Sequence, residues 1–323
     1  HLDTINWYIV AQESTAATMF ENGELDQYQP TGDYAIKFEK EAEEGKYQYM
    51  VTDYPGTIGL RFNFINGGTS GLMSNVKIRK AISYSIDREE MIDAVYGRYN
   101  PAYSYVAPAI TFNGSSYRSQ VGEVIEDEYN EYVGDPDKIV ALFQEGLDEL
   151  GVETPIEDIT LTYLTSGSTT EVQAEREYIQ QSLEETLGLT VELSVAGDSS
   201  LFIADRNEGN YDFFLGGWYS DYNDPLDFLY TNYTDAYGMS FGGYSNPDYD
   251  ALADQLVGET DMDKRLDIYK QMEQILLLDD CAFAPIYYAT KQVLLQNWVK
   301  DYRTSSFGAS AEFIWTYIDG KNQ

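Results

Sequence analysis

Residues that start and stop helices recur between residues 134 and 195, and they narrow the possible folds more than any other part of the chain. Asp135 followed by Pro136 is typical of a helix start, because an Asp side chain caps free backbone amides and proline suits the first helical turn. The apolar residues that follow recur at helical spacing, and Gly151 suits the left-handed backbone of a helix end. The sequence therefore predicts a helix between these residues.

The next elements form a strand, a helix and a second strand. Residues 159–164 and 191–195 alternate between apolar and polar side chains, as half-buried strands do. Between them, residues 171–187 place apolar side chains along one helical stripe, and Gly188 ends the helix. Two strands joined through a helix run parallel, and the connection is expected to be right-handed. The chain is therefore predicted to have an α/β fold.

Other stretches predict further strands and loops. The glycine-rich sequence NGGTSG at residues 66–71 is a candidate domain boundary. Residues 99–131 are acidic, irregular and rich in Tyr, so we predict a surface loop there and no core. Apolar runs predict strands, and the first of them is apolar enough to be buried. These runs are residues 4–10, 59–64, 211–218, 283–288 and 292–295.

A pair of helices is predicted directly after the glycine-rich segment. Ile78 and Ile82 lie one helical turn apart on the same face. Asp87 followed by Glu90 has the spacing of a capping box, so we interpret Asp87 as a helix cap. Near the end of the chain, residues 263–278 predict another helix.

The charge of the chain excludes two classes of partner. Its 323 residues include 55 Asp and Glu against 20 Lys and Arg, a formal net charge of −35. This field repels polyanions, so we predict no nucleic-acid binding, and attachment to a membrane through a polybasic surface fails for the same reason. The 43% hydrophobic and 15% aromatic content separates the chain from acidic disordered segments. We expect about two domains at this length.

The reactive side chains exclude several chemistries. His1 is the only histidine and Cys281 the only cysteine. The chain therefore has no intrachain disulfide, no thiolate-rich metal site and no internal Ser-His-Asp triad. No G-x-G-x-x-G or P-loop spacing occurs, which argues against nucleotide binding. We predict no cofactor and no catalytic residues.

The abundant acids leave two other possibilities. A glycosidase needs only two carboxylates, but 55 acids give close pairs by chance, so an acidic glycosidase is kept only as an alternative. For calcium, oxygen-bearing side chains crowd into one short stretch, but the glycine of an EF-hand loop is missing and Pro225 interrupts the run. These side chains are Asp221, Asn223, Asp224 and Asp227.

Tyrosine is the distinctive residue of this composition, with 29 Tyr beside four Trp. A rigid apolar ring with a polar tip suits a cleft that holds varied ligands through shape and a few hydrogen bonds. For any single tyrosine, packing in the core or covering the surface is the simpler interpretation.

Several segments together resemble the solute-binding proteins of oligopeptide ABC importers. Residues 76–88 (VKIRKAISYSIDR) are similar to the family's v-R-x-A-i-s-y-A-I-D-R, and residues 217–225 (GWYSDYNDP) resemble its G-W-x-x-D-Y-x-x-P block. Residues 20–26, 135–146 and 284–288 resemble further family segments in the same order. The family's mature members are much longer, so this sequence resembles their C-terminal portion.

The resemblance implies an α/β, periplasmic-binding-protein-like fold with two lobes. One mixed α/β lobe would be complete and the other would be present in part. The implied division places residues 1–65 in a remnant of the first lobe and residues 66–289 in the second lobe. Residues 290–323 would return to the first lobe.

The resemblance also implies where a peptide would lie. Its backbone would pair with strands that line the cleft, as in strand addition, and Asp221 would take its free α-amino group. A carboxylate just beyond the end of a strand, in an apolar aromatic setting, can form a charge-assisted hydrogen bond with an ammonium ion. The alternative is that Asp221 only anchors its loop by accepting backbone N–H groups. The other implied ligand-binding residues are Gly217, Trp218, Tyr219, Tyr222 and Asn223.

Three other residues of these segments receive interpretations. Trp218 lines the pocket or fills the core of the lobe, and we favour the pocket. Arg79 and Arg88 are expected to be structural, tying helix ends to loops. Some peptide-binding members carry a basic residue just before the G-W block that meets the ligand's C-terminal carboxylate, whereas residues 213–216 here are Phe, Phe, Leu and Gly. Longer peptides, more apolar peptides or a different solute are therefore expected.

The implied partners are an oligopeptide ligand and the permease subunits of an ABC transporter. The implied location is extracytoplasmic, at the outer face of the cytoplasmic membrane or in the periplasm. Contact with the membrane would occur only through an upstream lipid anchor, and we expect a monomer. The same fold binding an oligosaccharide or a metal complex remains the alternative within the family.

Overall fold

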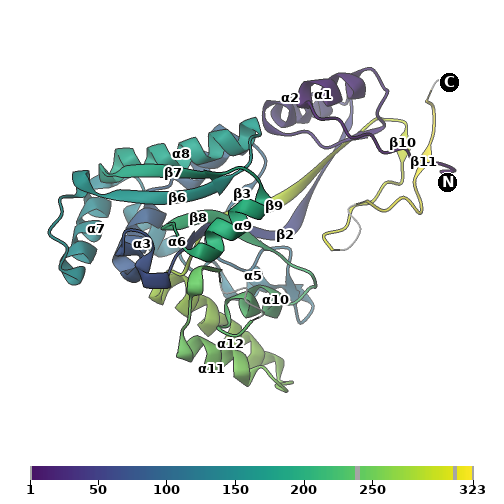
Figure 1. Cartoon of the computed structure of the whole chain (residues 1–323). Helices are drawn as coiled ribbons and strands as arrows, with labels where there is room; N and C mark the ends of the chain where they lie inside the picture. The colour runs from purple at the N-terminus through teal and green to yellow at the C-terminus, as the bar shows by residue number, and fades with distance from the viewer. Residues whose placement is uncertain (1, 237–240, 308–310, 322–323) are drawn as a thin grey trace.

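The structure is a computed structural model that describes residues 2–236, 241–307 and 311–321. Within these residues, the largest sheet has seven strands in mixed directions (Figure 1). β3 (Asn100–Pro101) pairs with β9 beside the main row. The order of the main row is β1 (Gln27–Tyr28), β9 (Phe283–Leu295), β2 (Gln48–Phe62), β8 (Phe213–Tyr219), β6 (Thr160–Ser166) and β7 (Thr190–Ala196).

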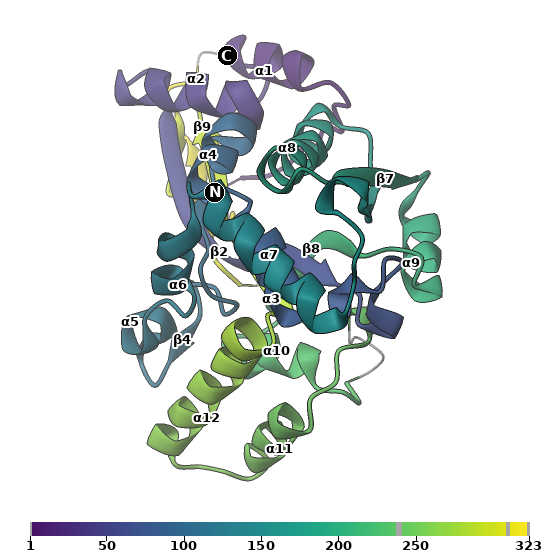
Figure 2. The same ribbon diagram turned by 90° about the vertical axis from the view of Figure 1, so that its left-hand side faces the viewer.

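Helices surround this sheet, and those at the two ends of the molecule lie far apart. α1 and α2 lie at one end and α11 and α12 at the other (Figure 2). The helices are α1 (Glu13–Glu21), α2 (Gly32–Glu43), α3 (Val76–Tyr84), α4 (Arg88–Met91), α5 (Tyr117–Val121), α6 (Glu126–Tyr132), α7 (Pro136–Leu150), α8 (Thr170–Leu187), α9 (Ser199–Glu208), α10 (Pro225–Leu229), α11 (Pro247–Gln255) and α12 (Met262–Gln274). α4 continues into a π-helical turn, η3 (Ile92–Tyr96), and α12 into another, η7 (Ile275–Asp279).

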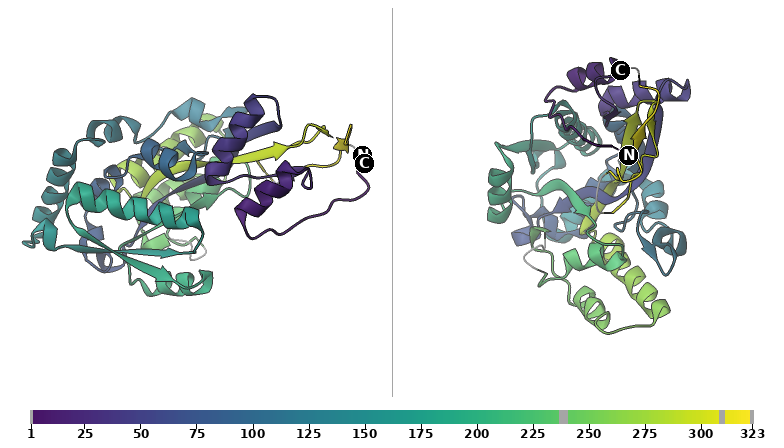
Figure 3. Two further views of the ribbon diagram at one scale, coloured as in Figure 1. Left: turned by 90° about the horizontal axis from the view of Figure 1, so that it is seen from above. Right: turned by 90° about the vertical axis from the view of Figure 1, so that its right-hand side faces the viewer.

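Two short hairpins complete the fold. β4 (Thr111–Phe112) pairs with β5 (Ser115–Ser116), and β10 (Val299–Lys300) pairs with β11 (Tyr317–Ile318). The second hairpin lies beside the N-terminal segment at one end of the molecule (Figure 3).

The strand–helix–strand unit is confirmed. β6 and β7 are parallel, with Thr160 opposite Thr190 at one end and Ser166 opposite Ala196 at the other. α8 connects them and ends at Gly188, whose backbone is left-handed. Local sequence signals therefore fixed this part of the fold.

The predicted helix boundaries are confirmed as well. The Asp135 side chain accepts a hydrogen bond from the Lys138 N–H at 3.2 Å, and Gly151 ends α7 in the left-handed conformation. At the second predicted cap, the Asp87 side chain accepts from the Glu90 N–H at 3.0 Å. Each cap satisfies a backbone donor that the first turn of a helix leaves free.

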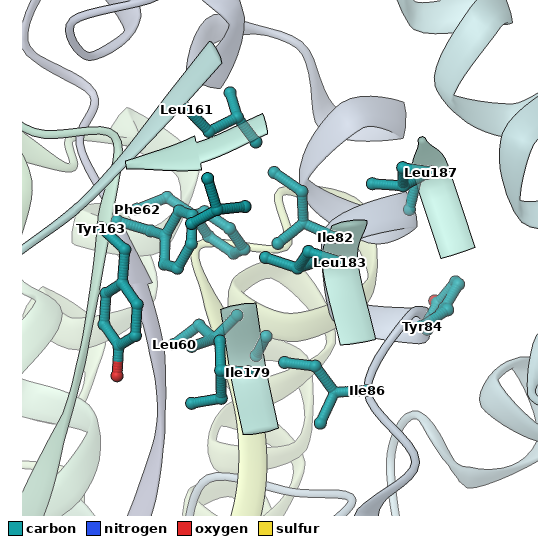
Figure 4. Close-up of a cluster of buried hydrophobic side chains, with 14 of the residues drawn as sticks. Leu60, Phe62, Ile82, Tyr84, Ile86, Leu161, Tyr163, Ile179, Leu183 and Leu187 are labelled. Carbon is teal, nitrogen blue, oxygen red and sulfur yellow. The ribbon is translucent and has the colours of Figure 1, made fainter. Parts of the chain in front are cut away.

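The largest apolar core lies between β2, β6 and α8, with α3 against them (Figure 4). α3 brings Ile82, and α8 brings Ile179, which is fully buried. Burial of side chains this large is the main favourable term in folding. The labelled members of this core are Leu60, Phe62, Ile82, Tyr84, Ile86, Leu161, Tyr163, Ile179, Leu183 and Leu187.

The prediction that residues 99–131 form a surface loop is wrong. Tyr105 and Tyr117 are fully buried in a second core that α11 and α12 help to build. The buried Glu273 carboxylate of α12 accepts hydrogen bonds from the Tyr105 and Val106 backbone, from the Tyr117 hydroxyl and from Arg118. The polar groups of this segment made it look solvent-exposed. An acid from a helix that is distant in the sequence instead accepts their hydrogen bonds inside the core.

The prediction of a buried strand at residues 4–10 is also wrong. The segment has no regular secondary structure, and Trp7 is 71% and Ile9 102% exposed. No described strand pairs with it, so its apolar side chains have no sheet to cover. The two predicted closing strands, residues 283–288 and 292–295, are parts of the single strand β9.

β2 and β9 are long strands that connect two parts of the molecule (Figure 1). Their antiparallel pairing shifts register between Asp53, opposite Thr290, and Thr57, opposite Tyr288. We call the described residues 2–53 and 290–321 the small part, and the described residues 57–289 the large part. The predicted boundaries at residues 65 and 289 remain predictions. β2 already contributes Leu60 and Phe62 to the core of the large part.

Among the residues that the structure describes, none of the helices combines the length and apolar character needed to cross a membrane.

Candidate functional site

β8 is paired along its whole length on one side but only at its start on the other. Towards β2 the pairing runs from Phe213 to Tyr219, and the Ser220 N–H continues it to the Pro55 carbonyl at 2.7 Å. Towards β6, only Phe213 and Phe214 have partners. We call the unpaired backbone of residues 215–219 the free side of β8. An extended chain could pair there, because unpaired strand backbone accepts a further strand.

Gly217 lies in the middle of this free side. A Cβ atom at this position would lie 1.9 Å from the Thr57 carbonyl oxygen of β2, which no side chain tolerates. Glycine at this position therefore allows β8 and β2 to pack closely together in the middle of the free side.

Asp227 anchors the loop that follows β8. Its buried Oδ2 accepts hydrogen bonds from the Trp218 Nε1–H at 2.8 Å and from the Asp221 backbone N–H at 2.9 Å. The Asp227 carboxylate therefore fixes both the end of β8 and the start of the loop. The sequence signal for this role was slight: a half-buried indole needs an acceptor, and Asp227 lies nine residues away.

Asp224 and Asn223 hold the other side of the loop. Asp224 caps α10 by accepting from the Leu226 N–H at 2.9 Å, and it also accepts from the Tyr269 hydroxyl at 2.8 Å. Asn223 pairs with Thr111 of β4, accepting from its N–H at 2.8 Å and donating to its hydroxyl at 2.6 Å. Thr111 is 112 residues away in the sequence, and no sequence signal pointed to it.

Asp221 is thereby placed without using its own side chain. The residue is exposed, and its carboxylate forms no hydrogen bond or ion pair with any described residue. The loop is held by the Asp221 backbone and by its neighbours, so the expected alternative, an anchoring role for the Asp221 carboxylate, is wrong. That anchor is Asp227.

Tyr219 and Tyr222 are half-exposed on the two sides of this acid, at 47% and 50%. The Tyr219 ring packs against Tyr54 of β2, with ring centroids 5.4 Å apart. The pKa of the Tyr222 phenol is raised, first by partial burial and then by the negative charges of Asp227, Asp224 and Asp221. The loop is therefore a region of negative potential.

Trp218 lies between the two possibilities predicted for it. Its ring packs against the second core of the large part, and its indole N–H is bound by Asp227. Of the six implied ligand-binding residues, the structure thus brings Gly217, Trp218, Tyr219 and Asp221 to the end of one strand. Asn223 faces β4.

The two arginines of the first resembling segment are structural, as expected. Arg79 donates to the backbone carbonyls of Met73, Asp280 and Cys281. The fully buried Arg88 donates to the carbonyls of Ala102 and Pro285. Each guanidinium joins segments that are distant in the sequence.

The calcium hypothesis gains no support from this geometry. Asp224 and Asp227 are engaged by protein donors, and Asn223 by Thr111. In the described ranges, no group of three or more His, Cys, Asp or Glu side chains is placed to hold a metal ion.

A cavity of about 360 Å³ lies close to the free side of β8, where the small and large parts meet. Tyr54, which packs on Tyr219, is one of its walls. The other lining residues come from the segment before α2, from the segment that follows η3 and from β9. They are Gln29, Pro30, Thr31, Arg98, Tyr99, Thr290, Lys291 and Gln292.

The fold is mixed α/β, with two long strands between two parts and an unpaired strand side near their junction. These features place the chain in the class of two-lobed binding proteins. The chain belongs to the bacterial extracellular solute-binding proteins, family 5, whose middle-region model matches residues 1–240. The family and fold expected from the sequence are thus confirmed.

Curated relatives match most of this chain. It is 29% identical over 298 residues to the dipeptide-binding protein DppE of Bacillus subtilis (strain 168), covering 92% of this chain and 50% of DppE. It is 30% identical over 234 residues to the oligopeptide-binding protein OppA of the same organism, covering 71% of this chain and 39% of OppA. The chain spans about half the length of the curated relatives it matches.

Solved structures agree. Listeria monocytogenes OppA bound to peptide matches with a TM-score of 0.75 at 28% identity, over 96% of this chain and 57% of that one. The pheromone receptor PrgZ matches with a TM-score of 0.74 at 26% identity over the same shares.

Proposed function

We propose that this chain belongs to a protein that binds oligopeptides outside the cytoplasm and delivers them to an ABC importer, without catalysis. The peptide lies between two lobes and pairs with the free side of β8. Its α-amino group binds the Asp221 carboxylate. The names of the relatives support the ligand class, since they include a dipeptide-binding protein and two oligopeptide-binding proteins.

The observation that carries this proposal is the exposed, unpartnered carboxylate of Asp221 just beyond an unpaired strand backbone. The free side of β8 offers the hydrogen-bonding groups that an extended peptide requires. Asp221 offers the charge that a free amino terminus requires, and Asp227 keeps it in place without competing for it. Only a ligand with both features would use both groups.

The lobes of this proposal correspond to the predicted division. Residues 66–289 form one lobe, and residues 1–65 and 290–323 belong to the other. Residues 57–62 of β2, which precede the first boundary of this division, pair with β8 of the large part. We propose the permease subunits of an importer as the partners and a monomer as the working form.

The first experiment is calorimetry on the complete gene product that contains this chain. A pool of short peptides with free amino termini is compared with the same pool after acetylation. Binding that is lost on acetylation is the expected result. Equal binding of both pools would keep peptides as ligands and remove Asp221 from its role. Binding of neither would favour the alternative of a different solute in the same fold, an oligosaccharide or a metal complex. A relative named heme-binding protein A, 27% identical over 250 residues, makes that alternative concrete.

A substitution tests the residue itself. Asp221→Asn is expected to weaken peptide binding by about 1.5–3 kcal/mol, the scale of a hydrogen bond to a charged group. Asp137→Asn is the matched control. It removes one exposed negative charge from the first turn of α7, where no described residue bonds to that carboxylate. Affinity that changes equally in both variants would assign the effect to net charge and would contradict a specific role for Asp221.

A further inference from the structure

Glu175 is an acid close to the free side of β8, and tyrosines surround its side chain. Glu175 lies in the first half of α8, and its carboxylate accepts a hydrogen bond from the Tyr96 hydroxyl of η3. The Tyr96 ring contacts Tyr287 of β9, with centroids 4.8 Å apart, and Tyr287 is stacked on Tyr99 at 4.4 Å. Burial is the main cause of the raised pKa values of three tyrosines on the neighbouring strands, and the negative charge of Glu175 raises them further. These are Tyr163 of β6, Tyr219 of β8 and Tyr287 of β9.

Among the described residues, no cationic side chain forms an ion pair with Glu175. Its Oε2 accepts from Tyr96, whereas Oε1 has no partner among the described residues and is not fully enclosed by them. Arg98, the guanidinium in this neighbourhood, is already bound by both carboxylate oxygens of Glu171, at 2.6 Å each, and by the Tyr99 hydroxyl. One carboxylate oxygen in an aromatic setting is therefore left for a further donor.

A second polar group near Glu175 also lacks a hydrogen-bond partner. The Tyr163 ring is 1% exposed, and its hydroxyl has no hydrogen-bond partner among the described residues. Buried hydroxyls without partners are rare because each costs free energy. This hydroxyl is enclosed by the protein, so Glu175 Oε1 is the acceptor that remains for a ligand.

We propose that Glu175 and the tyrosines around it form a subsite for a cationic side chain of the bound peptide, such as that of lysine. This proposal rests on the proposed function, because it places a peptide along the free side of β8. Tyr219 is the last residue of that free side, and it lies within range of the Glu175 charge.

The chemistry of an ammonium group fits these groups. It carries three donors and no acceptor, so it can donate to Glu175 Oε1 and keep further donors for water or for peptide carbonyls. The faces of the surrounding rings stabilise a cation further. A neutral side chain of the same length, such as norleucine, would leave Glu175 Oε1 without this donor.

The protonation of Glu175 gives this subsite a pH dependence. Burial raises the pKa of the Glu175 carboxyl to about 7, the hydrogen bond from Tyr96 lowers it, and the charge of Glu171 raises it. Only the ionised form attracts a cation. The ratio of lysine-peptide affinity to norleucine-peptide affinity is therefore expected to rise about tenfold between pH 6 and pH 8, because the free Glu175 carboxyl must first lose its proton. The ionisable groups facing Glu175 are Tyr96, Tyr99, Tyr163, Tyr219 and Tyr287 from other elements and Glu171 from its own helix, with Arg98 held by Glu171.

The experiment measures peptide affinity on the complete gene product by calorimetry. Tetra-alanine is compared with peptides in which lysine or norleucine replaces the second, third or fourth alanine. In at least one position, lysine is expected to bind about tenfold or more tightly than norleucine. Glu175→Gln keeps an oxygen for the Tyr96 hydroxyl but removes the charge, and it is expected to abolish both this preference and its rise with pH. Glu177→Gln, an exposed acid of the same helix, is the control and is expected to keep both.

The outcomes separate this inference from the proposed function. Equal affinity for lysine and norleucine peptides that do bind would overturn the subsite and leave peptide binding intact. A lysine preference that survives Glu175→Gln would also overturn it. Failure of every peptide, tetra-alanine included, would overturn the proposed function and the subsite together. A purely structural Glu175, which only fastens η3 to α8, would change stability without changing the ratio of lysine to norleucine affinity.

Discussion

An isoleucine of the large part and an isoleucine of the small part have opposite surroundings. Ile179 in α8 is completely buried, whereas Ile9 in the N-terminal segment is completely exposed. Ile179 belongs to the core that α3 and α8 form with β2 and β6 (Figure 4). The small part has a compact core of its own around Phe20 and Phe38, and beside it Trp7 stands open to solvent.

The difference teaches that apolar patterning alone does not decide burial. Residues 4–10 are as apolar as many strands, yet no described element pairs with them. Contiguous exposed apolar side chains commonly mark a surface that another structure covers. The small part is therefore the place where neighbouring structure in the complete gene product would change the stability of this chain most.

The largest effect is expected in the core of the large part. Ile179→Ala removes three carbon atoms from a fully enclosed position and leaves a cavity. We expect a loss of about 2–5 kcal/mol in the free energy of unfolding. Urea unfolding followed by far-UV circular dichroism measures it. A loss below about 1 kcal/mol would mean that the core around α8 is loosely packed.

An intermediate effect, with a defined pH dependence, is expected at Glu175. Its pKa is about 7 in the folded protein against 4.5 in the unfolded chain. The folded state therefore binds the proton more tightly, and the stability that Glu175 contributes falls as the pH rises from 4.5 to 7. Because Gln carries no charge, Glu175→Gln is expected to be about 1–3 kcal/mol more stable than the natural protein at pH 8.

At pH 4.5 the stabilities of Glu175→Gln and the natural protein are expected to agree closely. Urea unfolding at the two pH values makes the comparison, with Glu177→Gln as the variant that changes charge without burial. A difference that is the same at both pH values would show that Glu175 titrates normally.

The smallest effect is expected in the small part. Ile9→Ala makes the same chemical change as Ile179→Ala, but at an exposed position. We expect a change within about 0.5 kcal/mol in this chain. If the same substitution costs more than about 1 kcal/mol in the complete gene product, the exposed run is covered there, and the contrast between the two parts belongs to this chain alone.

Much of the large part could be predicted because its signals are local. The Asp135 cap and the glycine stops of α7 and α8 act within a few residues, and they alone define a helix end. The two errors came from non-local effects. Glu273 satisfies a tyrosine-rich segment more than 150 residues before it, and the run at residues 4–10 lacks a partner strand.

The site followed the same rule. The strand, the glycine and the acid beyond it were found from one short block of sequence. The separate roles of the aspartates in this block could not be predicted, because three aspartates within seven residues look alike in sequence. Only their surroundings assign the anchor to Asp227, the helix cap to Asp224 and the free carboxylate to Asp221. Glu175 carried no signal at all, since its distinction is the absence of a cation in three dimensions.

The pairing of β2 with β9 has a consequence for how the chain folds during synthesis. The Gln48 side chain donates to the backbone carbonyls of Gln296 and Val299, so β2 is synthesised about 250 residues before these partners. Until then β2 lacks its main neighbour, and an unpaired strand of this length is open to incorrect association. Contacts of such long sequence separation also slow folding. The chain is therefore expected to acquire the helices of the large part early and to close its central sheet only after β9 has been synthesised.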